Sequence, residues 1–198
     1  MQEVINKLLE PEIIMWSAVI LIIIISKFGI GLDYISVSDI IKNHMKCFKN
    51  SKNRKILVVP FINYIVLPFL MGAATMQVKM VDNDDINIIT IIISVLTAML
   101  FTMLTMVIDM KGKIKNNPEY YSTEGKISEK ALLETYYTIM FEIVISIVLL
   151  VICFAANFME KFDSFKSFFI YSLTYLLIIN LLMVIKRIFK VIDNDMKK

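Results

Sequence analysis

An acidic residue inside a long apolar segment is the position in this sequence that points most directly to chemistry. Glu142 lies six residues inside one end of the apolar run 136–158. A charge at this depth in a bilayer costs a few kcal/mol unless it is paired or hydrated. We therefore expect Glu142 to turn inward and to pair with Lys186 or Arg187, or to bind Asn180. The alternatives are that its carboxylate lines a water-filled cavity, a ligand site or a pore, or that it carries protons.

Other polar residues lie at a similar distance from the ends of their own apolar runs. If the helix faces that carry them converge, they form a polar layer inside the bundle. Asn, Ser and Thr side chains also join membrane helices by hydrogen bonds, each worth about 0.6 kcal/mol, and we favour that role over a binding site. The predicted layer comprises Glu142, Asn63, Thr102, Thr105, Asn180 and Ser146.

His44 and Cys47 are spaced about one helical turn apart, as a nucleophile and its base can be. No third residue is placed to orient His44, and an exposed, lysine-rich helix does not exclude water, so we expect no catalysis there. The chain has one His and two Cys, too few for a His- or Cys-based metal site within one copy. It has no phosphate-binding glycine loop and no HExxH or GxSxG constellation. The sequence predicts a protein that is not an enzyme and uses no cofactor.

Long apolar segments must position these residues. Hydrophobic residues make up 58% and charged residues 20% of the 198 residues, against about 45–50% and 25% in soluble domains. Five runs approach or exceed the roughly 20 residues that cross a bilayer. We predict an all-α bundle in a single membrane domain, residues 1–198, in which Pro60 and Pro68 bend the second span. The predicted spans are 13–30, 56–76, 88–108, 136–158 and 167–185.

Basic residues are sorted between the segments that join these spans. Segments 32–55, 109–133 and 186–198 carry six, five and five Lys or Arg residues, and the intervening segments and the N-terminal residues together carry four. Cytoplasmic segments are enriched in Lys and Arg, so the pattern predicts an outside N-terminus and a cytoplasmic C-terminus. The Ile-, Lys-, Asn- and Met-rich usage is typical of an AT-rich bacterial genome. We therefore expect a multi-pass protein of the bacterial plasma membrane.

The segment 37–48 has apolar and basic residues at helical spacing, which favours a helix lying on the inner membrane surface. Ser128 is a candidate N-cap for a helix that continues into the fourth span, and the fifth helix should extend past Lys186. These cytoplasmic parts would attract the anionic inner leaflet and dock a cytosolic protein. The predicted basic docking residues are Lys42, Lys46, Lys49, Lys52, Arg54 and Lys55.

The third span carries a stripe of small and polar residues at spacings of three and four. Small residues on one face allow close helix approach, so we interpret this stripe as a packing seam within one subunit or between copies. The stripe comprises Ser94, Ala98, Thr102, Thr105 and Asp109.

In its general plan the chain resembles small bacterial membrane proteins that are encoded beside a cytosolic partner, including membrane components of anti-phage and bacteriocin-immunity systems. Our first hypothesis is a non-enzymatic protein that self-associates or docks a cytosolic partner through its basic inner surface, and the resemblance of architecture points to a defence or stress system. A channel or small-solute transporter built around Glu142 is the alternative, and a lipid-modifying membrane enzyme is the third hypothesis. Nucleic acid is not an expected partner, because the basic residues do not form one stripe.

Overall fold

The computed structural model describes residues 37–49, 55–115, 123–158 and 162–196. The predicted span 13–30 and the docking residues Lys52 and Arg54 lie outside these ranges. The described chain is helical, as predicted, and its sole strand-like feature is an isolated bridge between Lys49 and Ile56. Its elements are α3 (Ser38–Lys46), α4 (Val58–Phe61), a π-helix (Ile62–Val66), α5 (Leu67–Val78), α6 (Asn83–Lys115), α7 (Thr123–Ala156) and α8 (Ser164–Met196).

Four helical segments in the described residues are long and apolar enough to cross a membrane. They are Val58–Val78, Asn83–Lys113, Glu129–Ala156 and Ser164–Lys190. Each overlaps one of the four predicted spans that begin at residue 56 or later. The chain is thus compatible with a multi-pass membrane protein.

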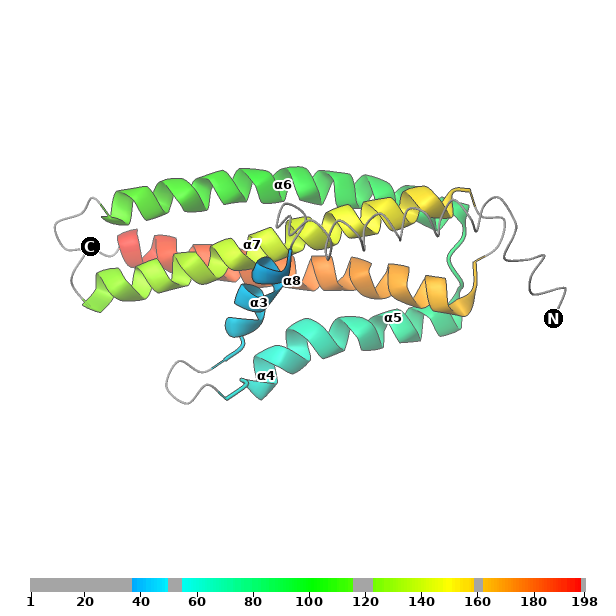
Figure 1. The fold of residues 1–198 in the computed structure, drawn as a ribbon, viewed down its shortest axis with the longest axis horizontal. Helices are drawn as coiled ribbons and strands as arrows, with labels where there is room; N and C mark the ends of the chain where they lie inside the picture. Colours follow the sequence, from blue (N-terminus) through cyan, green and yellow to red (C-terminus); the bar gives the residue numbers. More distant parts are fainter. Residues whose placement is uncertain (1–36, 50–54, 116–122, 159–161, 197–198) are drawn as a thin grey trace, which may run out of the picture. The chain divides into compact units, whose positions relative to one another are not determined.

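The four long elements pack in the order α6, α7, α8, α5, each against the next (Figure 1). One face of each helix supplies the core between them, as Ile86, Ile93 and Leu100 do on α6. The opposite face of α6 is also apolar but exposed, with Ile91 and Phe101 half or more accessible. A helix that is apolar on all sides is expected where its outer face meets lipid.

The stripe predicted on the third span faces away from the core. Ser94, Ala98, Thr102 and Thr105 are all exposed on α6. Each hydroxyl donates to a carbonyl of its own helix, as Thr102 does to Ala98 at 3.1 Å. The stripe therefore packs against none of the described helices, and the seam between copies stays a prediction.

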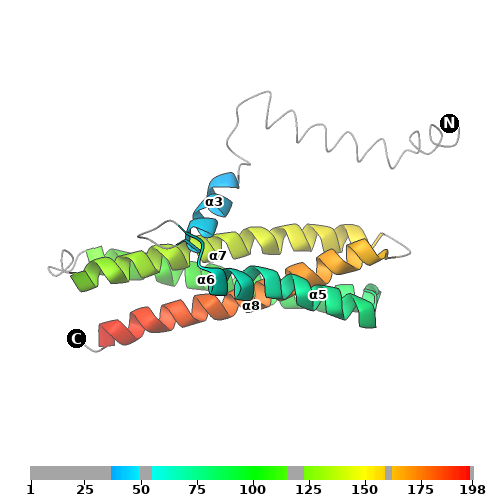
Figure 2. The same cartoon turned by 90° about the horizontal axis from the view of Figure 1, so that it is seen from below.

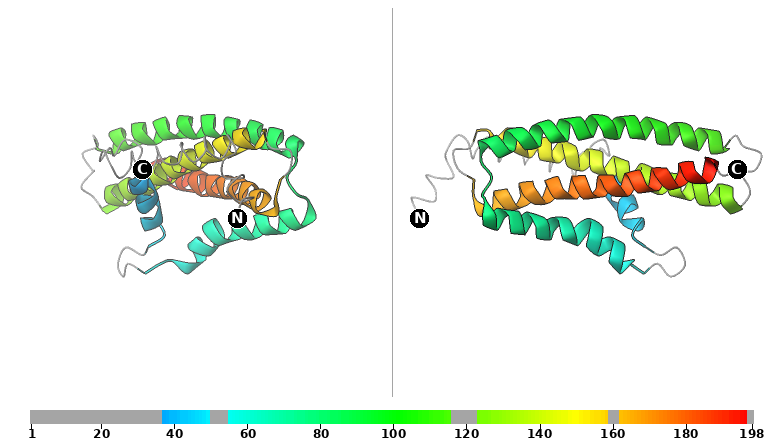
Figure 3. Two further views of the ribbon diagram at one scale, coloured as in Figure 1. Left: turned by 45° about the vertical axis from the view of Figure 1, so that its right-hand side comes forward. Right: turned by 180° about the vertical axis from the view of Figure 1, so that it is seen from behind.

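Proline shapes the second span. Pro68 has no N–H to donate to the Tyr64 carbonyl one turn earlier, and its ring crowds that carbonyl. The chain accommodates this as a π-helix, in which the Leu67 N–H bonds to the Ile62 carbonyl. Beyond this bulge α4 diverges from α8, whereas α5 packs closely along it (Figures 1 and 3). The predicted bend is therefore present.

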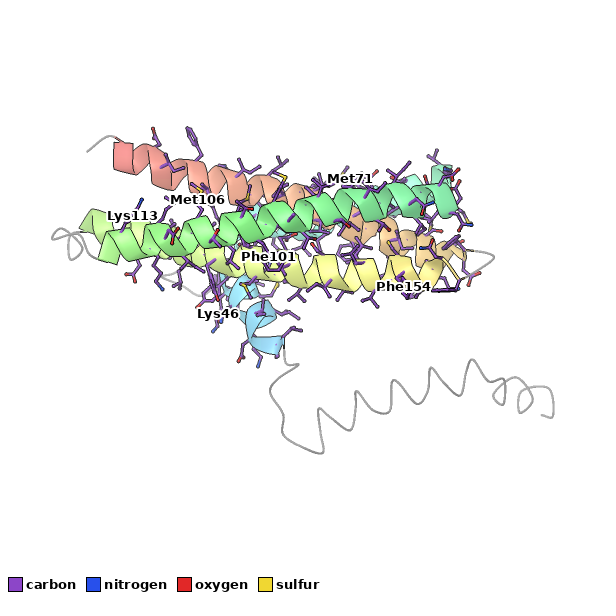
Figure 4. The ribbon with its side chains drawn as sticks, turned by 90° about the horizontal axis from the view of Figure 1, so that it is seen from above. Lys46, Met71, Phe101, Met106, Lys113 and Phe154 are labelled. Carbon is purple, nitrogen blue, oxygen red and sulfur yellow. The ribbon has the colours of Figure 1, made fainter. Side chains whose placement is uncertain are left out.

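The two ends of the bundle differ. We call the end where α6 and α8 finish and α7 begins the basic end, and the opposite end, with the α5–α6 and α7–α8 connections, the turn end. Lys46 and Lys113 lie toward the basic end, and Phe154 lies near the turn end (Figure 4). At the turn end Lys79 pairs with Asp82 and Asp85 at 2.8 and 2.9 Å.

The helices extend beyond the apolar core at the basic end. As predicted, α8 continues past Lys186, and it ends at Met196. The predicted cap position is wrong, because α7 already begins at Thr123 and Ser128 lies within it. The helix α3 runs crosswise to these long helices (Figure 2) and meets the side of α7.

Candidate functional site

An aromatic cluster fixes α3 to the bundle. The His44 imidazole is fully buried and stacks on the Phe141 ring of α7, with centroids 4.0 Å apart and planes at 2°. Phe48, also buried, contacts His44 edge-on at 5.2 Å. Burial, aided by the charge of Arg187, lowers the pKa of His44 to about 3. The imidazole is therefore neutral at pH 7 and acts as an aromatic anchor.

This arrangement corrects the expectation that His44 and Cys47 lie on an exposed helix. His44 is buried, Cys47 is partly buried, and neither imidazole nitrogen has a hydrogen-bond partner among the described residues. The Cys47 thiol donates instead to the Asn43 carbonyl at 3.4 Å. Burial raises the pKa of the Cys47 thiol, which makes it a weak nucleophile at neutral pH. His44 and Cys47 are thus not arranged as a base and its nucleophile.

The basic side of α3 points away from α7. Lys42, Lys46 and Lys49 are exposed, and so is Lys55 after the connection. Because His44 and Phe48 are held in the bundle, these lysines are presented from a fixed helix. Four of the six predicted docking residues are therefore exposed on α3 or shortly after it, and α3 meets α7 at Phe141, near the middle of that helix. The other two lie outside the described ranges.

Arg187 lies at the centre of the basic end, between α7 and α8. Its Nη2 is 3.8 Å from Glu134 Oε2, and its Nη1 donates to Thr138 Oγ1 at 3.0 Å. Lys130 Nζ is 3.9 Å from Glu134 Oε1. The Glu134 carboxylate therefore pairs with two cations, and both nitrogen–oxygen distances are long for an ion pair.

An open pocket of 520 Å³ lies beside this cluster. It occupies the space left where α4 diverges from α8. Among the described residues, five cationic side chains and one carboxylate, that of Glu134, line it. The cations are Lys49, Lys130, Lys186, Arg187 and Lys190; the other lining residues are Cys47, Phe48, Leu57, Pro60, Tyr64 and Met183.

The predicted polar layer forms only in part. Glu142, Ser146 and Asn180 are fully buried between α7 and α8. The Asn180 side chain faces the Glu142 carboxyl, but neither side chain makes a well-formed hydrogen bond within the described residues. Asn63, Thr102 and Thr105 are exposed instead, because their helices are rotated so that these positions face outward.

The predicted ion pair of Glu142 with Lys186 or Arg187 is wrong. Arg187 pairs with Glu134, which lies two turns before Glu142 on α7 and therefore nearer the basic end. Lys186 is exposed and lines the pocket. Sequence reasoning missed Glu134 because it lies just outside the predicted span. The sequence does contain a signal for Glu134: it lies four residues after Lys130 and four before Thr138, which puts all three on one face of a helix.

No protein-family model, curated protein or solved structure matches this chain. Within the described ranges, no group of three His, Cys, Asp or Glu side chains is placed to hold a metal ion. The function must therefore be argued from the residues of the basic end and of the buried layer.

Proposed function

We propose that this chain is a non-enzymatic, multi-pass protein of the bacterial plasma membrane that docks an acidic cytosolic partner at its basic end. The proposal includes five spans, with residues 13–30 as the first, an outside N-terminus and a cytoplasmic basic end. In this role it serves as the membrane subunit of a defence or stress system.

The fixed basic face of α3 carries this proposal. A surface helix held only by lipid can change its tilt and position, whereas α3 is anchored to α7 by the stacked rings of His44 and Phe141. The backbone positions that carry Lys42 and Lys46 are therefore fixed, and both side chains are exposed. A preorganised charged surface binds a complementary partner at lower entropic cost, and its charge speeds the encounter.

Charge reversal tests the docking. Lys42→Glu with Lys46→Glu should abolish crosslinking of an acidic cytosolic protein to the full-length chain in cells. The matched control, Lys111→Glu with Lys113→Glu, makes the same charge change on exposed positions of α6 and should keep it. Crosslinking that survives the α3 reversal, or that is lost equally in both variants, would contradict docking on α3. Glu142→Gln should leave it unchanged.

Self-association is the second part of the proposal. The exposed stripe on α6 offers small side chains whose hydroxyls are satisfied within their own helix, so two copies can approach closely there. In a chain without its natural cysteines, a cysteine at Ala98 should form a disulfide dimer in the membrane when a mild oxidant is added to accept the two electrons. A cysteine at Met99, on a different face of α6, should not. Equal dimer yield at both positions would argue against this seam.

An ion or proton pathway is the alternative function, favoured by the buried carboxyl of Glu142, which faces Asn180 but makes no well-formed hydrogen bond among the described residues. An intramembrane acid is costly to keep unless it serves a role. Flux into liposomes containing the purified chain would support this alternative if Glu142→Gln abolishes it while the helix content is retained. Absence of flux in the unmodified chain would remove it.

A further inference from the structure

We propose that the pocket at the basic end binds the phosphate group of one anionic phospholipid. The proposal rests on the membrane placement given above and not on the docking of a partner. It describes a defined site for a single lipid, which differs from the general attraction of lysines to an anionic leaflet.

The charges of the pocket favour an oxyanion. Among the described lining residues, five cations share one carboxylate, and Glu134 lies 3.8 and 3.9 Å from the nearest nitrogens of Arg187 and Lys130. Arginine has five N–H donors in a planar fork that fits phosphate, and lysines add point charges. Arg187 donates to Thr138 Oγ1 at 3.0 Å, and its guanidinium also interacts with the Cys47 thiol. A phosphate in the pocket would add acceptor oxygens beside the five cations.

The rest of the lining favours a lipid over a free phosphate. Leu57, Pro60 and Met183 give the pocket an apolar side, and Tyr64 contributes a ring with a polar tip. An anionic molecule that also needs an apolar surface is an amphiphile. A soluble phosphate ester would leave the apolar side of the pocket unused.

The surroundings provide a path for acyl chains. Val58 and Val59, next to the pocket on α4, are 63% and 68% exposed, and Leu182 on α8 is 61% exposed. At 520 Å³ the pocket has the size of a small-ligand site. It accommodates a headgroup but not a whole phospholipid, so the chains must lie along these apolar surfaces. The pocket also lies where the apolar part of α8 ends in Lys186 and Lys190, which is the depth of lipid headgroups.

Lipid retention in the purified, full-length chain tests the site. The protein is exchanged into nanodiscs of phosphatidylcholine with a defined fraction of phosphatidylglycerol, released, and weighed by native mass spectrometry. We expect one phosphatidylglycerol to be retained in preference to phosphatidylcholine. Lys186→Gln with Lys190→Gln should lower that preference by about thirtyfold, as expected for two lysines beside an anionic lipid. Both side chains are exposed, so the fold should persist.

The controls distinguish a built site from general surface attraction and from a soluble phosphate ligand. Lys111→Gln with Lys113→Gln removes the same charge from α6, away from the pocket, and should keep the preference. An equal loss in this control would mean general surface attraction and would overturn the site. Inorganic phosphate at millimolar concentration should not displace the lipid; displacement would assign the pocket to soluble phosphates instead. Failure of the chain to enter nanodiscs would count against the membrane placement, and Lys42→Glu with Lys46→Glu should leave lipid retention unchanged.

Discussion

His44 is held in this fold as an aromatic ring. Its stacking on Phe141 requires the neutral imidazole to remain buried beside the positive charge of Arg187. A protonated imidazole in that place would be desolvated and repelled. The contact that fixes α3 is therefore sensitive to pH, although no acid or base chemistry takes place there.

Acidification should release α3. His44 has a pKa of about 3 when docked and about 6.5 when solvated, so between these values the released helix binds a proton that the docked helix does not. The docking free energy is complete above pH 6.5 and falls as the pH decreases toward 3. At pH 5 the loss is about 2 kcal/mol. Hydrogen exchange of the α3 amides, corrected for intrinsic rates, should show it, and His44→Phe should abolish the pH dependence. Equal protection at pH 5 and 7.5 in the unmodified chain would contradict this prediction.

Glu142 illustrates what a single sequence cannot supply. Its burial is predictable from its depth in an apolar run, but its partner is not. Whether Lys186 or Arg187 reaches it depends on the rotation of α8 about its own axis, and the structure places Arg187 beside Glu134 instead. If Glu142 formed an ion pair with Lys186, Glu142→Leu would be tolerated only when Lys186 is neutralised as well. Because no such pair is present among the described residues, this double requirement is not expected.

We now predict that Glu142→Leu is tolerated with Lys186 intact. Replacing a buried carboxyl that faces Asn180 without a well-formed hydrogen bond by an apolar side chain of similar size removes a desolvation penalty of about 1–3 kcal/mol. Thermal unfolding in detergent should show an unchanged or raised Tm, and adding Lys186→Gln should change the Tm by the same amount in either background. A lowered Tm that Lys186→Gln restores would bring back the rejected ion pair.

The helices themselves are largely predictable, because apolar length and proline position determine them. The predicted run 56–76 corresponds to the helical segment Val58–Val78, and the bend comes from Pro68 as expected. Which face of each helix turns inward is harder to predict. Apolar residues surround these helices on all sides, so the pattern that fixes orientation in a soluble protein is absent. For this reason the sequence predicts Thr102 and Thr105 in the interior, whereas both are exposed on α6.

Close packing of α5 on α8 depends on the absence of a side chain at Gly72. A Cβ there would lie 2.7 Å from the Ser172 nitrogen and 2.8 Å from its Cα. Because the obstruction is backbone, one helix must move. Gly72→Ala should therefore lower the stability by about 1–3 kcal/mol, the usual cost of overpacking.

Gly112, on α6, provides the matched control for Gly72. A Cβ at Gly112 meets nothing within 4 Å among the described residues, so Gly112→Ala should be neutral, or should stabilise by up to about 1 kcal/mol through helix propensity. Thermal unfolding of both variants gives the comparison. Equal stability of the two would show that α5 and α8 are not in close contact at Gly72.

The proposed threading of the chain through the membrane rests on the distribution of charge along it. The pocket cations and Lys111 and Lys113 lie toward the basic end, and the exposed lysines of α3 lie beside the pocket, where α3 meets α7 at Phe141. That these segments share one side can be predicted without knowing any side-chain contact, because a chain that crosses the membrane repeatedly has every second connection on the same side. The pocket also requires that α4 diverge from α8 and that α8 be rotated so that Arg187 points toward α7. Neither feature can be read from the charge pattern.

Accessibility tagging should reveal this threading directly. In a chain without its natural cysteines, single cysteines at Asn50 and Tyr120 should both be shielded from a membrane-impermeant maleimide in intact cells. A cysteine at Met80, at the turn end, should react. Asn50 and Tyr120 both lie in basic segments, and segments rich in Lys and Arg are usually kept on the cytoplasmic side, where the reagent cannot reach them. If Asn50 and Tyr120 differ in reactivity, the docking face and the pocket cannot share one side of the membrane, and both proposals fail.

A further cysteine at Gln2 decides the number of crossings. If residues 13–30 span the bilayer, Gln2 lies on the opposite side from Asn50 and reacts with the reagent. If they do not, Gln2 is shielded together with Asn50, and the chain has the four spans seen in the described residues. The cytoplasmic side that we propose for the basic end is the same in both cases, because the odd or even number of crossings changes only the side of the N-terminus. The pocket and the α3 surface therefore depend on the sorting of charge and not on the first span.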